Sequence, residues 1–164
     1  MDNGFAESEG MRNLKYLLGI DLGTSGTKTV LFEETGRAVA SETIEYPLYQ
    51  PKNGWAEQEP EDWWNAARDT VKAVIAKSGV KPEDVKGVGI SGQMHGLVLL
   101  DREGRVLRRS ILWCDGRTQE ECDEITQTIG KERLIELSAN PALTGFTAGK
   151  ILWVRKHEPE VYEK

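Results

Sequence analysis

Residues 16–33 read YLLGIDLGTSGTKTVLFE, and this stretch decides the fold. The apolar run Tyr16–Asp21 and the β-branched run Thr27–Glu33 are typical of strands, and the glycines between them indicate a turn. A third strand is expected over Arg37–Tyr46, after a turn at residues 34–36. Parallel neighbours need a long crossover connection, so strands joined by such short turns must be antiparallel. The chain is therefore expected to begin with a β-meander.

A long helix is expected next, over Pro60–Lys77. Proline suits a first helical turn, Glu61 and Asp62 suit the positive N-terminal end, and Gly79 is a common stop. A fourth strand is expected at Val85–Ser91. Later segments are predicted as strand-like at residues 97–101 and 110–113, and as helices near 117–128, 131–138 and 147–157.

This order of elements predicts one α/β domain with a mixed sheet, occupying residues 14–164. Residues 1–13 are expected to form a mobile or added leader. The formal net charge of −6 argues against a general affinity for nucleic acid or for an anionic membrane. No apolar run approaches the roughly 20 residues that span a bilayer, and the acidic start lacks a signal core. We therefore expect a cytoplasmic protein whose two cysteines are reduced thiols.

The turn between the first two strands carries the first candidate site. Asp21 ends a buried strand, and Gly23 and Gly26 allow the backbone to approach an anion closely. The residues expected at the phosphates of a nucleotide are Gly23, Thr24, Ser25, Gly26, Thr27 and Lys28, three of which offer hydroxyl donors. Asp21 is expected to hold magnesium through water. A strand follows the glycines, which excludes the P-loop pattern, although a tight β-turn with a solvated aspartate also fits the string.

A second candidate site follows the fourth strand, where glycines bracket Gln93, Met94 and His95. Loops held by rigid strands often carry function, and an imidazole can exchange hydrogen bonds with sugar hydroxyls. A thioether can pack against the carbon skeleton of a sugar. Taken alone, a histidine such as His95 is more often a satisfied loop residue than a ligand contact.

Trp113, Asp115 and Arg117 join a strand to a helix. In one interpretation Asp115 caps that helix and Arg117 pairs with a nearby acid; in the other, the three side chains reach a sugar. His157 is expected at the surface. The remaining tryptophans are expected to pack inside the domain, and they are Trp55, Trp63, Trp64 and Trp153.

Five stretches together resemble the FGGY family of carbohydrate kinases, and most closely its xylulose-kinase branch. They are YLLGIDLGTSGTKTVLF, GWAEQEPEDWW, VGISGQMHG, ILWCDGRT and GFTAGKILWVRKHEPEVY. The resemblance implies a ribonuclease-H-like (actin-like ATPase) fold and ATP-dependent phosphorylation of a sugar, D-xylulose in that branch. It places Asp21 beside magnesium and the transferred phosphoryl, and Met94 and His95 at the sugar. Glycerol kinases carry an Arg-Glu pair at the positions of Met94 and His95, and this chain lacks that pair.

The chain departs from the family pattern at Cys114, where asparagine is common, and at Thr144 and Gly149, where proline is common. Family members continue well beyond this segment, and the resemblance implies that their general base lies there. Hence the isolated chain is expected to be inactive and to self-associate through uncovered apolar surface. The alternatives are another FGGY-type sugar kinase, a nucleotide- or sugar-binding module without catalysis, and an actin-like assembly unit.

Overall fold

The computed structural model describes residues 15–164, so the predicted leader at residues 1–13 lies outside the described part of the chain. The strands are β1 (Tyr16–Leu22), β2 (Gly26–Glu33), β3 (Ala38–Glu45), β4 (Glu57–Gln58), β5 (Val85–Gly92) and β6 (Ser110–Ile111). The helices are α1 (Pro60–Ser78), the 3₁₀ turn η1 (Pro82–Asp84), α2 (Gln119–Ile129), α3 (Lys131–Ser138), α4 (Thr147–His157) and α5 (Pro159–Tyr162).

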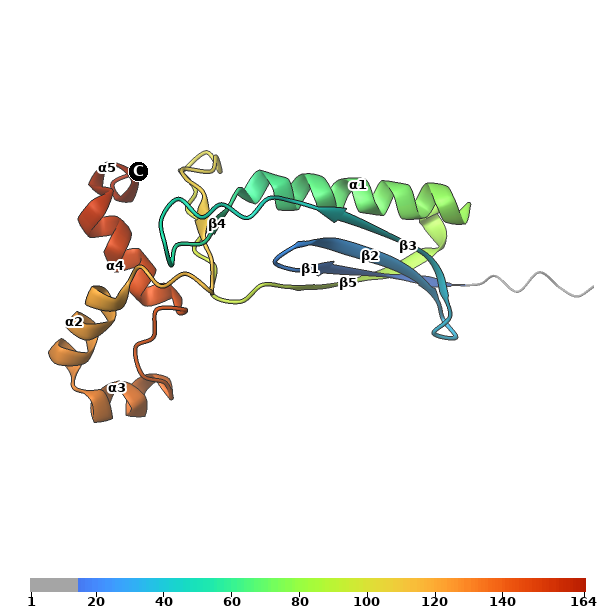
Figure 1. The fold of residues 1–164 in the computed structure, drawn as a ribbon. Coiled ribbons are helices and arrows are strands. Elements are labelled where there is room, and N and C mark those ends of the chain that lie inside the picture. Colours follow the sequence, from blue (N-terminus) through green and yellow to red (C-terminus); the bar gives the residue numbers. More distant parts are fainter. Residues whose placement is uncertain (1–14) are drawn as a thin grey trace, which may run out of the picture.

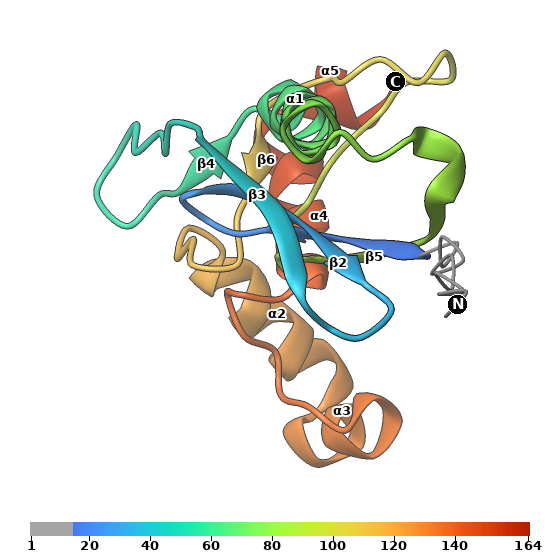
Figure 2. The same ribbon diagram turned by 90° about the vertical axis from the view of Figure 1, so that its right-hand side faces the viewer.

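The main sheet has the strand order β3-β2-β1-β5 (Figures 1 and 2). β1, β2 and β3 pair antiparallel, whereas β5 pairs parallel to β1. The chain reaches β5 only after α1, which provides the crossover that a parallel neighbour requires. The predicted mixed sheet, begun by a β-meander, is confirmed.

The β1–β2 hairpin has a register that runs from Tyr16 opposite Glu33 to Leu22 opposite Thr27. A strand therefore follows Gly26, as the sequence predicts. A Cβ atom added to Gly26 would lie 2.7 Å from the carbonyl oxygen of Ile44 on β3. Only glycine fits at this point, because β3 passes directly beside the start of β2.

Helix α1 covers one face of the sheet (Figure 1). It begins with Pro60 and ends at Gly79, whose φ of 67° is the left-handed conformation that favours glycine. Its buried face is formed by Ala66, Thr70 and Val74. Burial of this face against the sheet is the main stabilising contact of the domain's first half.

The other face of the sheet is open within the described residues, since the later helices lie beyond the strand ends (Figures 1 and 2). Leu17 exposes 48% of its surface there, and its cross-strand neighbours Phe32 and Val30 on β2 are partly buried on the same face. Apolar side chains exposed together on a sheet face commonly mark a site of contact with further protein, and this face is suited to such contact.

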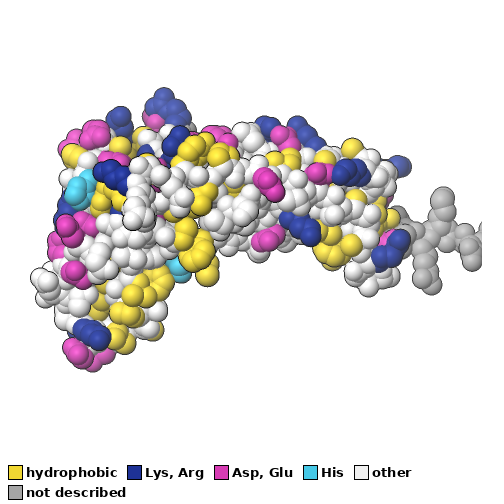
Figure 3. All heavy atoms as spheres, in the orientation of Figure 1, with side chains coloured by type: hydrophobic (Ala, Val, Ile, Leu, Met, Phe, Trp, Pro, Cys, Tyr) yellow, Lys and Arg dark blue, Asp and Glu magenta, His cyan; other side chains and the backbone are white. Residues whose placement is uncertain are grey.

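A second core joins the later segments at the end of the sheet toward which the β1–β2 hairpin points (Figure 1). It consists of Leu97, Ile111, Trp153 and Val154. Helices α2 and α4 pack against one another here, close to α3 and α5. Hydrophobic side chains also reach the surface of this helical end, as Figure 3 shows over α2 and α3.

Two local predictions are wrong. Residues 97–101 do not form a strand, and β6 is shorter than the predicted segment 110–113. Leu97 pairs with Ile111, so in a regular antiparallel ladder Leu99 would pair with Arg109. Instead the Leu107 N–H donates to the Leu99 carbonyl. The segment 107–111 therefore contains two more residues than the opposite segment 97–99, and the ladder is broken by a bulge. That bulge turns Arg108 toward Glu57, where it forms an ion pair.

Trp64 was expected to pack inside the domain but is 67% exposed, because it lies on the outer side of α1. Trp55 and Trp153 do pack together, edge to face, with ring centroids 5.4 Å apart. His157 lies at the surface as predicted, stacked on Trp153. Cys114 and Cys122 are both free thiols. Among residues 15–164, no helix is both long enough and apolar enough to cross a bilayer.

Candidate functional site

The two motifs singled out in the sequence meet at one edge of the sheet. Because β5 runs parallel to β1, both strands end at the same side, with Asp21 opposite Ser91 and Leu22 opposite Gly92. The Ser91 hydroxyl donates to Asp21 Oδ1 over 2.6 Å. The turn after β1 and the turn after β5 are therefore neighbours, although 70 residues separate these two side chains in the chain.

Asp21 is exposed and lines an open groove together with Lys28, Ile90 and Ser91. Within the described residues, no group of three or more histidine, cysteine or carboxylate side chains could cage a metal ion. Magnesium binds through one or two carboxylates, keeps several waters and takes further oxygens from phosphates. Asp21 is the residue that would hold it, and the bound ion would neutralise charge on a phosphate chain.

Residues 21–28, which comprise the turn Gly23–Ser25 and the strand ends beside it, are here called the phosphate hairpin. Hydrogen bonds hold this hairpin from several sides. The Gly23 N–H donates to the Gly26 carbonyl over 3.0 Å. The Gly23 carbonyl accepts from Tyr46 Oη at 2.5 Å. Burial raises the pKa of the Tyr46 phenol, so this donor stays protonated to higher pH than an ordinary tyrosine does. The backbone of the hairpin is therefore fixed before any ligand arrives.

The remaining hairpin residues divide into exposed and buried ones. Ser25 and Lys28 are exposed at the mouth of the turn, and Thr24 is partly buried. Thr27 is fully buried, and its Oγ1 has no hydrogen-bond partner among the described residues. Thr27 therefore lies on the inner side of the hairpin, whereas Ser25 and Lys28 are accessible to a ligand.

The turn after β5, Gln93–Gly96, is here called the sugar turn. Gln93 points back to the phosphate hairpin, and its Nε2 donates to the Gly23 carbonyl over 3.2 Å. Met94 is 70% exposed, and His95 is also exposed. His95 has a φ of 61°, which is uncommon for a residue other than glycine. This conformation presents Met94 and His95 to solvent while Gln93 stays inside.

The backbone of His95 is held by Lys150 of α4. Lys150 is fully buried, and its Nζ donates to the carbonyls of His95 and Gly145, both over 2.7 Å. The Thr147 hydroxyl donates to the same His95 carbonyl over 3.3 Å. Burial lowers the pKa of Lys150 to about 8, although the nearby Asp115 carboxylate opposes the shift. This lysine clamps the sugar turn to the loop that precedes α4.

Two pockets open on His95. One, of about 240 Å³, lies against the sheet edge and is lined by Leu22, Trp63, Gln93 and Val98 among others. The second, of about 280 Å³, lies among α2, α3 and α4 and is mostly apolar. The His95 ring contacts Phe146 edge to face, with centroids 4.7 Å apart. The imidazole thus stands at the border between the sheet and the helical end.

Trp113, Asp115 and Arg117 do not act as a group. The Trp113 indole is 49% exposed and its Nε1 donates to Thr24 Oγ1 over 3.3 Å, so it borders the phosphate hairpin. Asp115 and Arg117 are buried and form an ion pair over 2.8 Å. Asp115 also accepts from the Ala56 N–H over 2.6 Å, and the structure has Thr118, not Asp115, at the start of α2.

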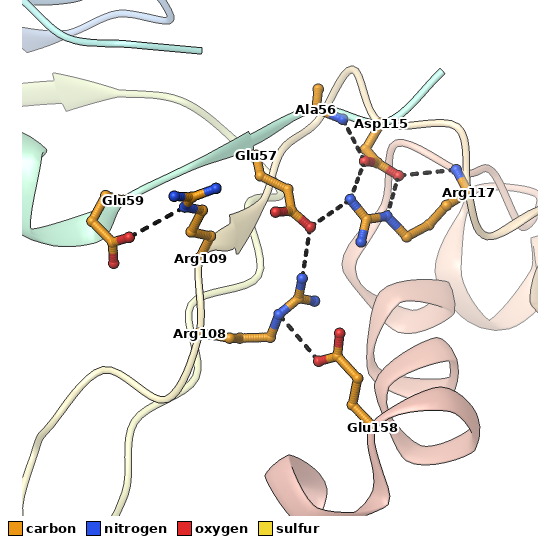
Figure 4. A network of polar contacts seen from close by, with 8 residues as sticks. All are labelled: Ala56, Glu57, Glu59, Arg108, Arg109, Asp115, Arg117 and Glu158. Atoms are coloured by element: carbon orange, nitrogen blue, oxygen red, sulfur yellow. Dashed lines mark hydrogen bonds and ion pairs between the residues drawn. The ribbon is translucent and has the colours of Figure 1, made fainter. Parts of the chain in front are cut away.

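Figure 4 shows the network that Asp115 and Arg117 belong to. Arg117 reaches Glu57 over 2.8 Å, Glu57 reaches Arg108 over 2.7 Å, and Arg108 reaches Glu158 over 3.2 Å. The Arg117 guanidinium also lies 3.7 Å from the centre of the Trp55 ring. Burial on this scale is tolerated because each charge has a partner. The network fastens β4 and β6 to the helical end, behind the site.

Sequence reasoning missed Tyr46, Gln58 and Lys150 at this site. Tyr46 and Gln58 lie outside both glycine-rich motifs, and only the folded backbone brings them to the hairpin. Lys150 offered a signal, because it stands in the apolar run Ala148–Val154. A lysine in such a run is rarely buried without a specific hydrogen-bonding role.

Comparison with known proteins gives one consistent family. The family model described as "FGGY family of carbohydrate kinases, N-terminal domain" matches residues 16–164. The xylulose kinase of Bacillus subtilis is 45% identical over 151 residues, which cover 92% of this chain and 30% of that protein. The xylulose kinase of Escherichia coli is 45% identical over 147 residues, covering 90% and 30%.

The crystal structure of xylulose kinase from Rhodospirillum rubrum superposes with a TM-score of 0.86 at 30% identity, covering 91% of this chain and 30% of that one. The predicted ribonuclease-H-like, actin-like ATPase fold is confirmed by this likeness. The chain spans about 30% of the length of the relatives it matches. With the matched family model covering the chain from Tyr16 onward, the chain belongs to the FGGY family of carbohydrate kinases.

Proposed function

We propose that the protein containing this chain is an ATP-dependent sugar kinase that phosphorylates D-xylulose to D-xylulose 5-phosphate. The observation that carries the proposal is the parallel pairing of β1 with β5, which sets the phosphate hairpin beside the sugar turn. A kinase needs its two substrates side by side, since phosphoryl transfer depends chiefly on positioning and on charge stabilisation. Relatives named xylulose kinases, 45% identical, support the choice of sugar.

In this proposal the chain's own residues have distinct tasks. Ser25, Lys28 and the backbone of the phosphate hairpin bind the phosphates of ATP, and Asp21 holds the magnesium ion that accompanies them. Met94 packs on the carbon skeleton of the sugar and His95 hydrogen-bonds its hydroxyls. Gly23, Thr24, Gly26 and Thr27 shape the turn, and Gln93 and Trp113 border it.

The chain by itself is proposed to be inactive. Asp21 lies on the phosphate side, where it accepts a hydrogen bond from Ser91, and the two buried carboxylates nearby, Asp115 and Glu57, are paired with arginines. None of these is free to take the proton of an attacking sugar hydroxyl, which general-base catalysis requires. The chain alone would then act as a binding module.

The test is sugar-dependent ADP formation by the full-length protein containing this chain, with D-xylulose compared against glycerol and other pentuloses. We expect D-xylulose to give the highest kcat/KM, and the 164-residue chain to give no sugar-dependent ADP. Absence of turnover with every sugar would overturn the proposed function. Robust turnover by the 164-residue chain would overturn its proposed inactivity.

We also propose that the 164-residue chain self-associates through the open sheet face that carries Leu17, Val30 and Phe32. A contiguous apolar surface of a few hundred Å² favours association, and the same face on a second copy is the occupant of matching chemistry. A cytoplasmic location, without nucleic-acid or membrane partners, fits the net charge of −6 and the two free thiols.

A further inference from the structure

A single buried side chain joins the phosphate hairpin to the sugar turn. Gln58 of β4 is fully buried. Its Nε2 donates to the Thr24 carbonyl over 2.7 Å. Its Oε1 accepts from Gln93 Nε2 over 2.9 Å. Gln93 also reaches the Gly23 carbonyl, so Gln58, Gln93 and the Gly23–Thr24 backbone close a ring of hydrogen bonds between the two turns.

The orientation of the Gln58 amide is determined by its neighbours. The Trp63 indole N–H donates to Oε1 over 3.1 Å, and an indole nitrogen can only donate. The carbonyl oxygens of Thr24 and Pro47 can only accept, and they lie 2.7 and 3.4 Å from Nε2. A flipped amide would place like groups against each other at both ends. The side chain is therefore locked by α1 on one side and by the hairpin on the other.

We propose that Gln58 is a positioning residue that fixes the separation between the phosphate hairpin and the sugar turn, so that the phosphoryl group passes to the sugar and not to water. The proposal rests on the proposed function. In productive transfer, the bond between the terminal phosphorus and the bridging oxygen of ATP breaks, a bond from that phosphorus to the sugar oxygen forms, and the sugar hydroxyl loses its proton, which gives ADP, the sugar phosphate and a proton. Misaligned, the same phosphorus is attacked by water, which gives ADP, inorganic phosphate and a proton. Positioning errors of about 1 Å are known to cost on the order of 10²-fold in rate.

The experiment compares Gln58→Met with the wild type in the full-length protein. Methionine has a similar length but neither donates to Thr24 nor accepts well from Gln93. We expect kcat for sugar phosphorylation to fall on the order of 10²-fold, with smaller changes in the KM for sugar and for ATP. The amount of ADP formed per sugar phosphate should rise well above the wild-type ratio. This ratio does not depend on how much of the protein is folded.

Thr70→Val is the matched control. Thr70 is also fully buried and polar, and it shares a 2.7 Å hydrogen bond with Thr29 between α1 and β2, away from both turns. Its loss should lower stability as Gln58→Met does, because each leaves a buried partner unsatisfied. The ratio of ADP to sugar phosphate should stay at the wild-type value in Thr70→Val.

Gln58→Glu separates the two halves of the bridge. A carboxylate can still accept from Gln93 and Trp63, but it faces the Thr24 carbonyl with an acceptor in place of a donor. We expect an excess of ADP in this variant too, because the hairpin side of the bridge is broken. If both variants keep the wild-type ratio, the inference is overturned while the proposed function stands. If the wild type phosphorylates no sugar, the proposed function and the inference fail together.

Discussion

Lys150 shows how one residue can hold a functional turn and also make stability depend on pH. The side chain is buried, and its pKa is lowered to about 8 because the ammonium loses its water. The groups that act on it electrostatically are Asp115, Cys114 and Arg117. In the unfolded chain an unperturbed lysine keeps its proton up to about pH 10.4. Between these values the unfolded chain holds more protons, so folding must become more favourable as pH rises.

The corresponding prediction concerns Lys150→Met. From pH 7.5 to 10, the free energy of unfolding of the wild type should rise relative to that of the variant. Other groups with shifted pKa values, such as Tyr46 and Cys122, are present in both proteins and largely cancel in the difference. Urea unfolding at several pH values measures this. Parallel pH dependences of the two proteins would mean that Lys150 does not titrate as its burial implies.

Among the elements, the β1–β2 hairpin tolerates the least change. A Cβ on Gly26 would lie 2.7 Å from the Ile44 carbonyl oxygen, which is part of a strand and cannot move alone. Gly26→Ala should therefore destabilise the fold by about 1–3 kcal/mol, the range for overpacked sites. It should also weaken nucleotide binding in the full-length protein, because the hairpin must shift away from β3.

Gly89→Ala is the control for that substitution. Gly89 also lies in a strand of the same sheet, but a Cβ there would have nothing within 4 Å. Alanine at this position should leave the urea midpoint nearly unchanged. Equal losses in the two variants would show that the tight approach of β3 does not limit the hairpin.

The elements also show what local sequence can and cannot predict. The hairpin, α1 and β5 were predictable because glycines, a first-turn proline and apolar periodicity all agreed there. The segment 97–101 was not, since its strand-like composition is overridden by the bulge that sends Arg108 to Glu57. Asp115 and Arg117 could not be assigned from sequence, because their partners Ala56 and Glu57 are more than 50 residues away.

The bridge by Gln58 illustrates the same limit at the site. The glycine-rich turns revealed where ligands could bind, because their backbone chemistry is local. The side chain that ties them together comes from a third segment, whose hydrogen bonds exist only in the folded molecule. Sequence therefore predicted the two turns but not the side chain that connects them.

At the scale of the whole molecule, the open sheet face leads to a prediction about assembly. Light scattering of the 164-residue chain should give a mass that increases with concentration. Leu17→Lys should reduce this, because it places a charge on the open apolar face, where Leu17 is 48% exposed. Ala76→Lys adds the same charge on exposed α1 and should not. A clean monomer of the unmodified chain at high concentration would contradict the proposal.

The central claim is that two neighbouring turns at one sheet edge hold two different substrates. Steady-state kinetics of a His95 variant in the full-length protein tests it most directly, with His95→Asn preferred over His95→Ala because asparagine tolerates the φ of 61°. We predict that the KM for D-xylulose rises up to about tenfold, as expected for one lost hydrogen bond, while the KM for ATP changes little. Equal increases in both KM values would contradict the separate roles of the phosphate hairpin and the sugar turn.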